Sequence, residues 1–312
     1  MQYDPADIRA VQEHFGFVHP APVEKDWHVM QALAAISTLD ASPFRFIFAG
    51  GTALARAHKL VRRMSEDVDF KIVLESPEPF SQSARSKRLS ALRNSVTSAL
   101  LNAGFQFDPE NPQHLRARNS SQYALYNLPY ETTATPISEL RPTIQLELTY
   151  APLRLAPVIL PVSSFVAEAF GRAPEVTAIG CVNITETAAE KLVALTRRTA
   201  MELAGLSRDP DPALVRHIYD LHMIGERIDS AEVVRLAREI AVNDSKEFQN
   251  QYPAYAADWK SETRKALSAI KNDPIYRERY ASFIRNMVYG ETPDFAAAFG
   301  TVERLAALLL AD

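Results

Sequence analysis

The spacing of apolar and polar residues differs between the two halves of the chain. In the first half, short runs either alternate in polarity or are rich in aromatic and β-branched residues, as in FRFIFA and DVDFKIVL. Such runs predict β-strands. A longer pattern with apolar residues three and four apart, closed by Gly104, predicts a helix over residues 84–104. The predicted strands lie at residues 44–49, 67–74, 121–128, 143–150 and 175–184.

After residue 184, every pattern that we recognise has helical spacing. Two more helical patterns, over residues 4–17 and 24–40, precede the first strand. Strands mixed with helices and then followed by helices alone indicate two domains. We therefore predict an α/β domain with N-terminal helices over residues 1–184 and an all-helical domain over residues 185–312.

Composition restricts the class of protein and its partners. The 312 residues include 47% hydrophobic residues and carry a formal net charge of -4, so the chain is globular and has no overall positive field for nucleic acid or membrane. An RNA partner would need a local basic patch. Cys181 is the only cysteine, which excludes an internal disulfide and favours a reducing compartment. Without an apolar signal core or a run of about 18 apolar residues, we expect a cytoplasmic protein without membrane contact.

Two adjacent glycines provide the first candidate for chemistry. Gly50 and Gly51 follow the predicted strand at 44–49 and precede a helix that begins near Thr52. Backbone N–H groups at such a turn can bind a phosphate, because no Cβ atom keeps the ligand away. The alternative, a tight turn without a ligand, is more common for a glycine pair considered alone.

Two aspartates in the next strand strengthen the case for a ligand. Asp67 and Asp69 would point to one face, about 6 to 7 Å apart along the backbone, where both carboxylates could bind Mg²⁺. Without a cation their like charges repel each other. Glu147 lies in TIQLELTY, opposite to the apolar side of that strand, and is a candidate third metal ligand. The alternatives are a solvated acidic strand and a Glu147 that faces solvent.

The order of these residues resembles a known family. The run GGTAL at 50–54, followed by R-x-S-x-D-x-D at 63–69, is similar to the first motif of the polymerase-β-like nucleotidyltransferases, and specifically of the AbiEii-type toxins of bacterial toxin–antitoxin systems. KLVALTRR at 191–198 resembles the K-x-x-A-x-x-x-R helix of that family, and RHIYDL at 216–221 resembles its closing motif. The resemblance covers residues 46 to 222 in the family's order.

This resemblance implies a mixed-sheet nucleotidyltransferase core and a helical domain that completes the active-site cleft. It also implies transfer of a nucleoside monophosphate from a nucleoside triphosphate, with Mg²⁺, to RNA such as the tRNA 3′ end, and a cognate antitoxin encoded nearby. By this resemblance the catalytic residues are Asp67, Asp69, Lys191 and Asp220, the metal ligands are Asp67 and Asp69, and the triphosphate ligands are Gly50, Gly51, Arg63, Ser65, Lys191 and Arg198. Glu147 is added to the metal ligands from its position on the neighbouring strand.

The later motifs also have simpler interpretations. Lys191 and Arg198 are seven residues apart and share a helix face, which offers two cations to a triphosphate but is also typical of an ordinary basic face. Arg216 and Asp220 have the spacing of a structural ion pair. Two other functions therefore remain as alternatives: a nucleotidyltransferase that modifies a small molecule such as an antibiotic, and a non-catalytic module that binds a nucleotide or a partner protein.

Overall fold

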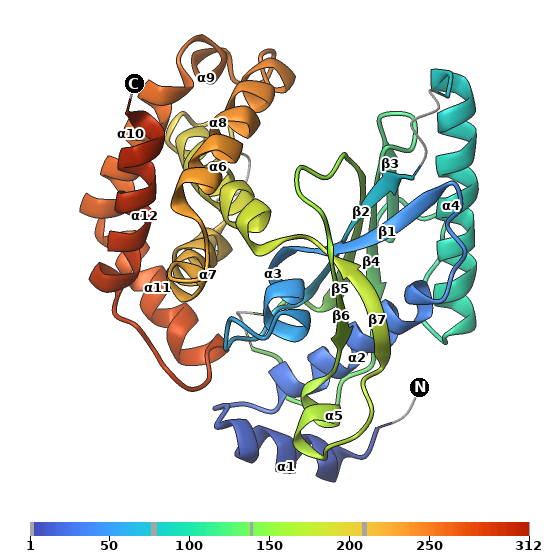
Figure 1. The fold of residues 1–312 in the computed structure, drawn as a ribbon. Helices are drawn as coiled ribbons and strands as arrows, with labels where there is room; N and C mark the ends of the chain where they lie inside the picture. The colour runs from blue at the N-terminus through green and yellow to red at the C-terminus, as the bar shows by residue number, and fades with distance from the viewer. Residues whose placement is uncertain (1–2, 76–79, 138–139, 208–210, 312) are drawn as a thin grey trace. The chain divides into compact units, whose positions relative to one another are not determined.

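The computed structural model describes residues 3–75, 80–137, 140–207 and 211–311, and the chain forms two compact units, Met1–Val182 and Asn183–Asp312 (Figure 1). The first unit is built around a sheet with helices, and the second is built from helices (Figure 1). Each unit has a buried apolar cluster of its own. The predicted fold class, a mixed α/β core followed by helices, is confirmed.

A seven-stranded mixed sheet forms the centre of the first unit, in the order β3-β4-β5-β2-β1-β7-β6. β2 lies in the middle of this sheet, parallel to β5 on one side and antiparallel to β1 on the other. The strands are β1 (Phe44–Ala49), β2 (Asp67–Leu74), β3 (Leu115–Arg118), β4 (Tyr123–Pro129), β5 (Thr143–Tyr150), β6 (Val158–Val162) and β7 (Val176–Cys181).

Helices α2 (Ala21–Ser37) and α4 (Gln82–Asn102) cover one face of the sheet. Alternate residues of β2 and β5, such as Phe70 and Leu146, are buried in the core that these helices share. Because successive side chains of a strand point to opposite faces, the intervening residues lie on the other face. Asp67, Asp69 and Glu147 are among them. The other helices of this unit are α1 (Pro5–Phe15), α3 (Gly50–Thr52) and α5 (Phe165–Ala169).

The structure differs from the sequence predictions in its short elements. The sequence does not predict strands β3 and β6, because β3 has four residues that are mostly exposed and β6 carries no alternating buried face. The helix predicted after the glycines is also shorter than expected. α3 continues as a π-helical turn over Ala53–Ala57, and His58 follows this turn.

Helix α6 (Ile184–Leu203) packs against α8 and α10 in the second unit, and α12 packs against α7 and α8. Asn183 caps α6 by accepting a hydrogen bond from the N–H of Thr185, which satisfies one of the free donors at the helix start. Within the described ranges, every helix is too short or too polar to cross a bilayer. The remaining helices are α7 (Arg216–Ile224), α8 (Ser230–Glu247), α9 (Pro253–Ala257), α10 (Trp259–Asn272), α11 (Pro274–Met287) and α12 (Phe295–Leu310).

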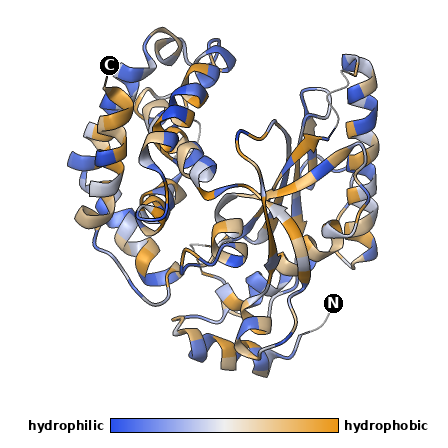
Figure 2. Cartoon of the chain, in the orientation of Figure 1, coloured by the Kyte–Doolittle hydropathy of each residue, from blue (hydrophilic) through white to orange (hydrophobic). Residues whose placement is uncertain are grey.

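The helices of the second unit carry both hydrophilic and hydrophobic residues along their length (Figure 2). In α12, for example, the apolar Val302 and Leu305 are buried while the charged Arg304 is exposed. Such amphipathic helices gain stability by turning one side toward their neighbours. This explains why the helical spacing is visible in the sequence.

Candidate active site

The acidic residues predicted to bind metal lie on two neighbouring strands, on the face of the sheet opposite to α2 and α4. Asp67 is the first residue of β2, and the buried Val68 separates it from Asp69. Glu147 of β5 is the register partner of Asp69, and neighbouring strands are about 4.8 Å apart. The tertiary structure therefore brings a third carboxylate beside the pair. In the parts of the chain that are described, no three His, Cys, Asp or Glu side chains are gathered closely enough to form a metal-binding cluster.

The glycine turn packs directly against this acidic strand. Gly50 has a φ of 74°, which favours glycine. A Cβ atom at this position would lie 1.9 Å from Oδ2 of Asp69. Any other residue at position 50 would have to adopt a left-handed backbone and would place its Cβ atom against the carboxylate of Asp69, so the structure would have to rearrange.

Gly51 is required for a different contact. A Cβ atom at Gly51 would lie 2.2 Å from Nη2 of Arg63 and 2.9 Å from Oγ of Ser65. Both side chains are buried, and Nη1 of Arg63 donates a hydrogen bond of 2.9 Å to the carbonyl of Met64. The structure thus collects Gly50, Gly51, Arg63, Ser65 and Asp69 in one place. Because Arg63 is buried against Gly51, its side chain can support the glycine turn. The sequence did not indicate this role.

A hydroxyl group links the glycine turn to the start of β2. The side chain of Thr52 is fully buried and donates a hydrogen bond to the backbone carbonyl of Asp67. The sequence indicates Thr52 only as the start of a helix. This bond fixes the first residue of β2 relative to the turn.

Asp67 has a partner that the sequence did not reveal. Nη1 of Arg141 lies 2.6 Å from Oδ1 of Asp67, and the two side chains are 37% and 30% exposed. Behind them, the buried Lys25 of α2 donates hydrogen bonds of 2.7 Å to Glu66 and to the carbonyl of Arg141. Burial lowers the pKa of Lys25, against the opposing effect of Glu66. The only signal in the sequence was a run of charged residues, Glu24 to Asp26, inside an otherwise apolar helix.

Glu147 is held by two hydroxyl groups. Tyr123 of β4 donates a hydrogen bond of 3.0 Å to Oε2, and Thr149 donates one of 3.0 Å to Oε1. Burial raises the pKa of the Tyr123 hydroxyl, and the nearby Glu147 raises it further. The carboxylate of Glu147 is therefore oriented within the sheet and does not simply extend into solvent.

In the second unit, Lys191 of α6 and Asp220 of α7 form a buried ion pair. Nζ of Lys191 lies 2.8 Å from Oδ2 of Asp220, with side chains 8% and 0% exposed. Nδ1 of His217 is 3.4 Å from the same Nζ atom. The structure thus brings together the Lys and Asp of the two later motifs, although 29 positions of sequence separate them.

Arg198 lies seven residues beyond Lys191 on α6 but in a different environment. Its guanidinium forms an ion pair with Asp211, and its side chain is 45% exposed. Exposed pairs of this kind contribute little to stability. Arg198 is accessible to a ligand, but its charge is already paired with Asp211.

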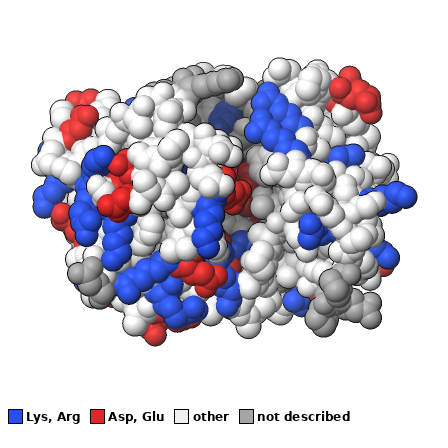
Figure 3. Space-filling view, turned by 90° about the horizontal axis from the view of Figure 1, so that it is seen from above, with Lys and Arg blue, Asp and Glu red and all other residues white. Residues whose placement is uncertain are grey.

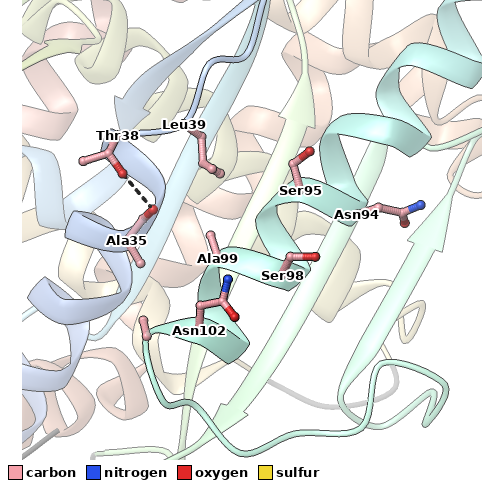
Figure 4. Close-up of a pocket in the computed structure, with 9 residues that line it drawn as sticks. Ala35, Thr38, Leu39, Asn94, Ser95, Ser98, Ala99 and Asn102 are labelled. Atoms are coloured by element: carbon pink, nitrogen blue, oxygen red, sulfur yellow. Dashed lines mark hydrogen bonds between the residues drawn. The ribbon is translucent and has the colours of Figure 1, made fainter.

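A separate hollow lies between α2 and α4 of the first unit, with a volume of 660 Å³. Small and polar residues line it, and Thr38 within it donates a hydrogen bond to the carbonyl of Ala35 (Figure 4). None of the predicted site residues lines this hollow, and it contains no acidic or basic side chain. It lies on the α2 and α4 side of the sheet, away from the carboxylates.

Residues 31–301 match the family described as Nucleotidyl transferase AbiEii toxin, Type IV TA system. A search of the curated proteins gives no significant match. Among solved structures, the fold is similar to that of MenT4, a nucleotidyltransferase toxin from Mycobacterium tuberculosis H37Rv, with a TM-score of 0.54 and 18% identity over 97% of this chain and 89% of that chain.

The family match extends over most of the sequence, from the end of α2 to α12. It includes the glycine turn, the acidic strand and the Lys191–Asp220 pair. The resemblance drawn from the motifs is thereby confirmed. The chain belongs to the AbiEii family of nucleotidyltransferase toxins of type IV toxin–antitoxin systems.

Proposed function

We propose that this nucleotidyltransferase uses Mg²⁺ to transfer a nucleoside monophosphate from a nucleoside triphosphate to RNA, with the 3′ acceptor end of tRNA as its substrate. A hydroxyl of the RNA attacks the α-phosphate, and pyrophosphate leaves as the bond between the α- and β-phosphates breaks. Modification of that end would block translation. The observation that carries the proposal is the packing of Gly50 against Asp69, since it joins a phosphate-binding turn to a strand of carboxylates.

A pair of carboxylates fits Mg²⁺, which usually binds one or two carboxylates together with the phosphates of a substrate. Asp67 and Asp69 offer carboxylate oxygens on one face of β2, and Glu147 is the register partner of Asp69. Mg²⁺ prefers such oxygen ligands in proteins. We propose Asp67 and Asp69 as ligands and Glu147 as a third. When bound, Mg²⁺ would supply positive charge at the α-phosphate and lower the pKa of the attacking hydroxyl.

The other residues bind and orient the nucleotide. Backbone N–H groups at Gly50 and Gly51, together with the Ser65 hydroxyl, are proposed to contact phosphate oxygens. The ammonium of Lys191 is proposed to contact the β- or γ-phosphate, as a point charge. Asp220, 2.8 Å from that ammonium, is proposed to orient it. Arg198 is proposed as a further triphosphate ligand. Arg63, which is buried against Gly51, is proposed to act on the triphosphate indirectly, by supporting the glycine turn.

An RNA acceptor requires local positive charge, because the chain as a whole has a net charge of -4. On the face drawn in Figure 3, Lys and Arg side chains stand among Asp and Glu. Helix α4 differs from this mixture, since it contains four basic residues and no acidic residue. These are Arg85, Lys87, Arg88 and Arg93. Such a helix can contact a phosphate backbone. Because α4 covers the sheet face opposite to the carboxylates, it would bind a part of the RNA away from the end that is modified.

Incubation of the protein with Mg²⁺, total RNA and each of the four nucleoside triphosphates labelled at the α-phosphate tests this function. We expect the label on RNA of tRNA size, and no label with the Asp69→Asn protein. Label on a small acceptor would favour the small-molecule alternative. Nucleotide that is bound but never converted would favour a non-catalytic module.

A further inference from the structure

Arg141 contacts the proposed metal site without belonging to any motif. It lies two residues before β5, and its Nη1 atom is 2.6 Å from Oδ1 of Asp67 and 3.9 Å from Oε1 of Glu66. The side chain is 37% exposed. The guanidinium of Arg141 therefore lies beside Asp67, the first residue of β2 and the first of the proposed metal ligands.

The backbone of Arg141 is fixed by a buried ion pair. Its N–H donates a hydrogen bond of 2.9 Å to Glu66, and its carbonyl accepts one of 2.7 Å from Lys25. Lys25 and Glu66 are 2.7 Å apart, with side chains 0% and 2% exposed. Burial of two charges is costly unless both are paired. This pair therefore anchors the main chain of Arg141 and leaves the guanidinium as the part that can move.

A guanidinium and a divalent cation compete for the same carboxylate. Both are positive, and the contact of Arg141 with Oδ1 lies where Asp67 would bind Mg²⁺. When the cation binds, repulsion drives the guanidinium from Asp67, but the anchored backbone keeps it close to the site. A guanidinium matches the geometry of phosphate oxygens, which accompany the cation in a nucleotide complex.

We propose that Arg141 is an additional nucleotide-binding residue whose guanidinium leaves Asp67 for a phosphate oxygen when the divalent cation binds. This proposal rests on the proposed function, because it requires a cation at Asp67. It gives Arg141 opposite effects on two ligands. Arg141 weakens binding of the cation alone and strengthens binding of the triphosphate with the cation.

Equilibrium binding to Arg141→Gln tests both effects without turnover. The first measurement is Mn²⁺ binding in the absence of nucleotide, followed by electron paramagnetic resonance, and we expect about fivefold tighter binding than in the wild type. The second is binding of a non-hydrolysable triphosphate analogue with Mn²⁺, measured by calorimetry, and we expect about tenfold weaker binding.

Arg172→Gln provides a matched control. Arg172 forms a 3.0 Å ion pair with Asp7 in the same unit, with side chains 55% and 31% exposed. Its replacement should change neither affinity. Arg141→Lys keeps the positive charge and should recover part of the triphosphate affinity, which a loss of folding would not allow.

The proposal is overturned if either affinity of Arg141→Gln equals that of the wild type, or if both affinities fall together. The Asp67→Asn protein separates this failure from failure of the metal site. If the wild type binds Mn²⁺ no better than Asp67→Asn, the metal ligand at Asp67 and the role of Arg141 are both wrong. If only Asp67→Asn loses Mn²⁺ and Arg141→Gln is unchanged, the role of Arg141 alone is wrong.

Discussion

At the scale of single residues, the contact between Gly50 and Asp69 explains why two glycines precede a D-x-D strand. Side chains are excluded from Gly50 by its φ of 74° and by the carboxylate of Asp69. They are excluded from Gly51 by Arg63. The glycines therefore allow the acidic strand and the turn to approach each other, whether or not a phosphate is bound.

Gly50→Ala should abolish nucleotide transfer and lower stability by about 1 to 3 kcal/mol, because the new Cβ atom is both strained and in collision with Asp69. Gly171→Ala is the matched control. Gly171 has a φ of 61°, but no atom lies within 4 Å of the position of its Cβ. Gly171→Ala should lose stability through backbone strain alone and should keep its transfer activity. Transfer assays and denaturant unfolding of both proteins measure the difference, and equal activity loss would contradict this explanation.

Asp69→Asn should abolish transfer while the protein stays folded. The substitution removes a proposed metal ligand and also one of the like charges near Asp67 and Glu147. We expect the thermal midpoint without Mg²⁺ to remain the same or to rise. A large fall in this midpoint would show that Asp69 is structural.

Asp26 should make stability depend on pH. It is buried on α2, accepts a 2.7 Å hydrogen bond from the N–H of Phe165, and lies 3.9 Å from Arg56. Burial raises its pKa to about 7, against the lowering effect of Arg56, and Glu175 and Glu168 also raise it. The unfolded pKa is about 4. Protonated Asp26 therefore contributes its full share of the unfolding free energy below about pH 4, and this contribution is lost as the pH rises through about 7.

The side chain of Asp26→Asn cannot titrate. Between about pH 5 and pH 7 the unfolding free energy of this variant should therefore fall less steeply than that of the wild type, and the two slopes should differ by up to about 1.4 kcal/mol per pH unit. Denaturant unfolding at several pH values measures both proteins. The same pH dependence in both would remove Asp26 as the titrating group.

At the scale of elements, each part of the candidate site depends on how neighbouring elements pair. The parallel pairing of β2 with β5 places Glu147 beside Asp69. The antiparallel pairing of β2 with β1 makes Ala49, the residue before the glycine turn, the register partner of Asp69. In the second unit, the packing of α6 against α7 brings Lys191 to Asp220. If β2 paired with β1 or β5 in another register, Asp69 would no longer lie beside Ala49 and Glu147.

Lys191→Ala should weaken binding of nucleoside triphosphate with Mg²⁺ by about 10- to 100-fold, because it removes a charge-assisted contact of about 1.5 to 3 kcal/mol. Binding of the monophosphate should change little. If Asp220 positions Lys191, then Asp220→Ala has a similar effect and the double variant is far from additive. Calorimetry on the four proteins of this cycle measures the coupling.

Because this pair is buried, removal of one partner also costs stability. Unfolding measurements on each variant must therefore accompany the binding data, and His217, 3.4 Å from Nζ of Lys191, provides a milder comparison as His217→Gln. Strictly additive losses would show that Lys191 and Asp220 act separately. Unchanged triphosphate affinity in Lys191→Ala would make KLVALTRR an ordinary basic helix.

At the scale of the whole molecule, the chain combines a sheet unit that carries the carboxylates with a helical unit that carries the buried lysine. Family membership makes it a toxin whose partner is an antitoxin. A toxin acts on the growth of the cell that makes it, so growth provides a test that does not need an identified acceptor.

Overexpression of the wild-type chain should stop growth through loss of translation, if tRNA is the acceptor. Asp67→Ala and Asp69→Ala should be harmless at equal protein levels, because each lacks a proposed metal ligand. Growth curves with incorporation of a labelled amino acid provide the measurement, and immunoblots control for expression. Equal toxicity of all three chains would exclude catalysis as the cause.

The strands at 44–49, 67–74 and 143–150, the helical second half and the family were predictable from the sequence, because each depends on residues that are close neighbours in the chain. The D-x-D spacing likewise places Asp67 and Asp69 on one face through the two-residue repeat of a strand alone. Their roles as metal ligands, and those of the other site residues, stay predictions.

Other features depend on contacts between distant residues, for which a local pattern carries no signal. Lys25 meets Glu66 and Arg141 across 41 and 116 positions of sequence, and Tyr123 meets Glu147 across 24. A buried charge and an exposed one look the same in a sequence, and only the packing of α2 against the sheet determines which residues lose water and need partners. For the same reason, the approach of Arg141 to Asp67 could be seen only in the folded chain.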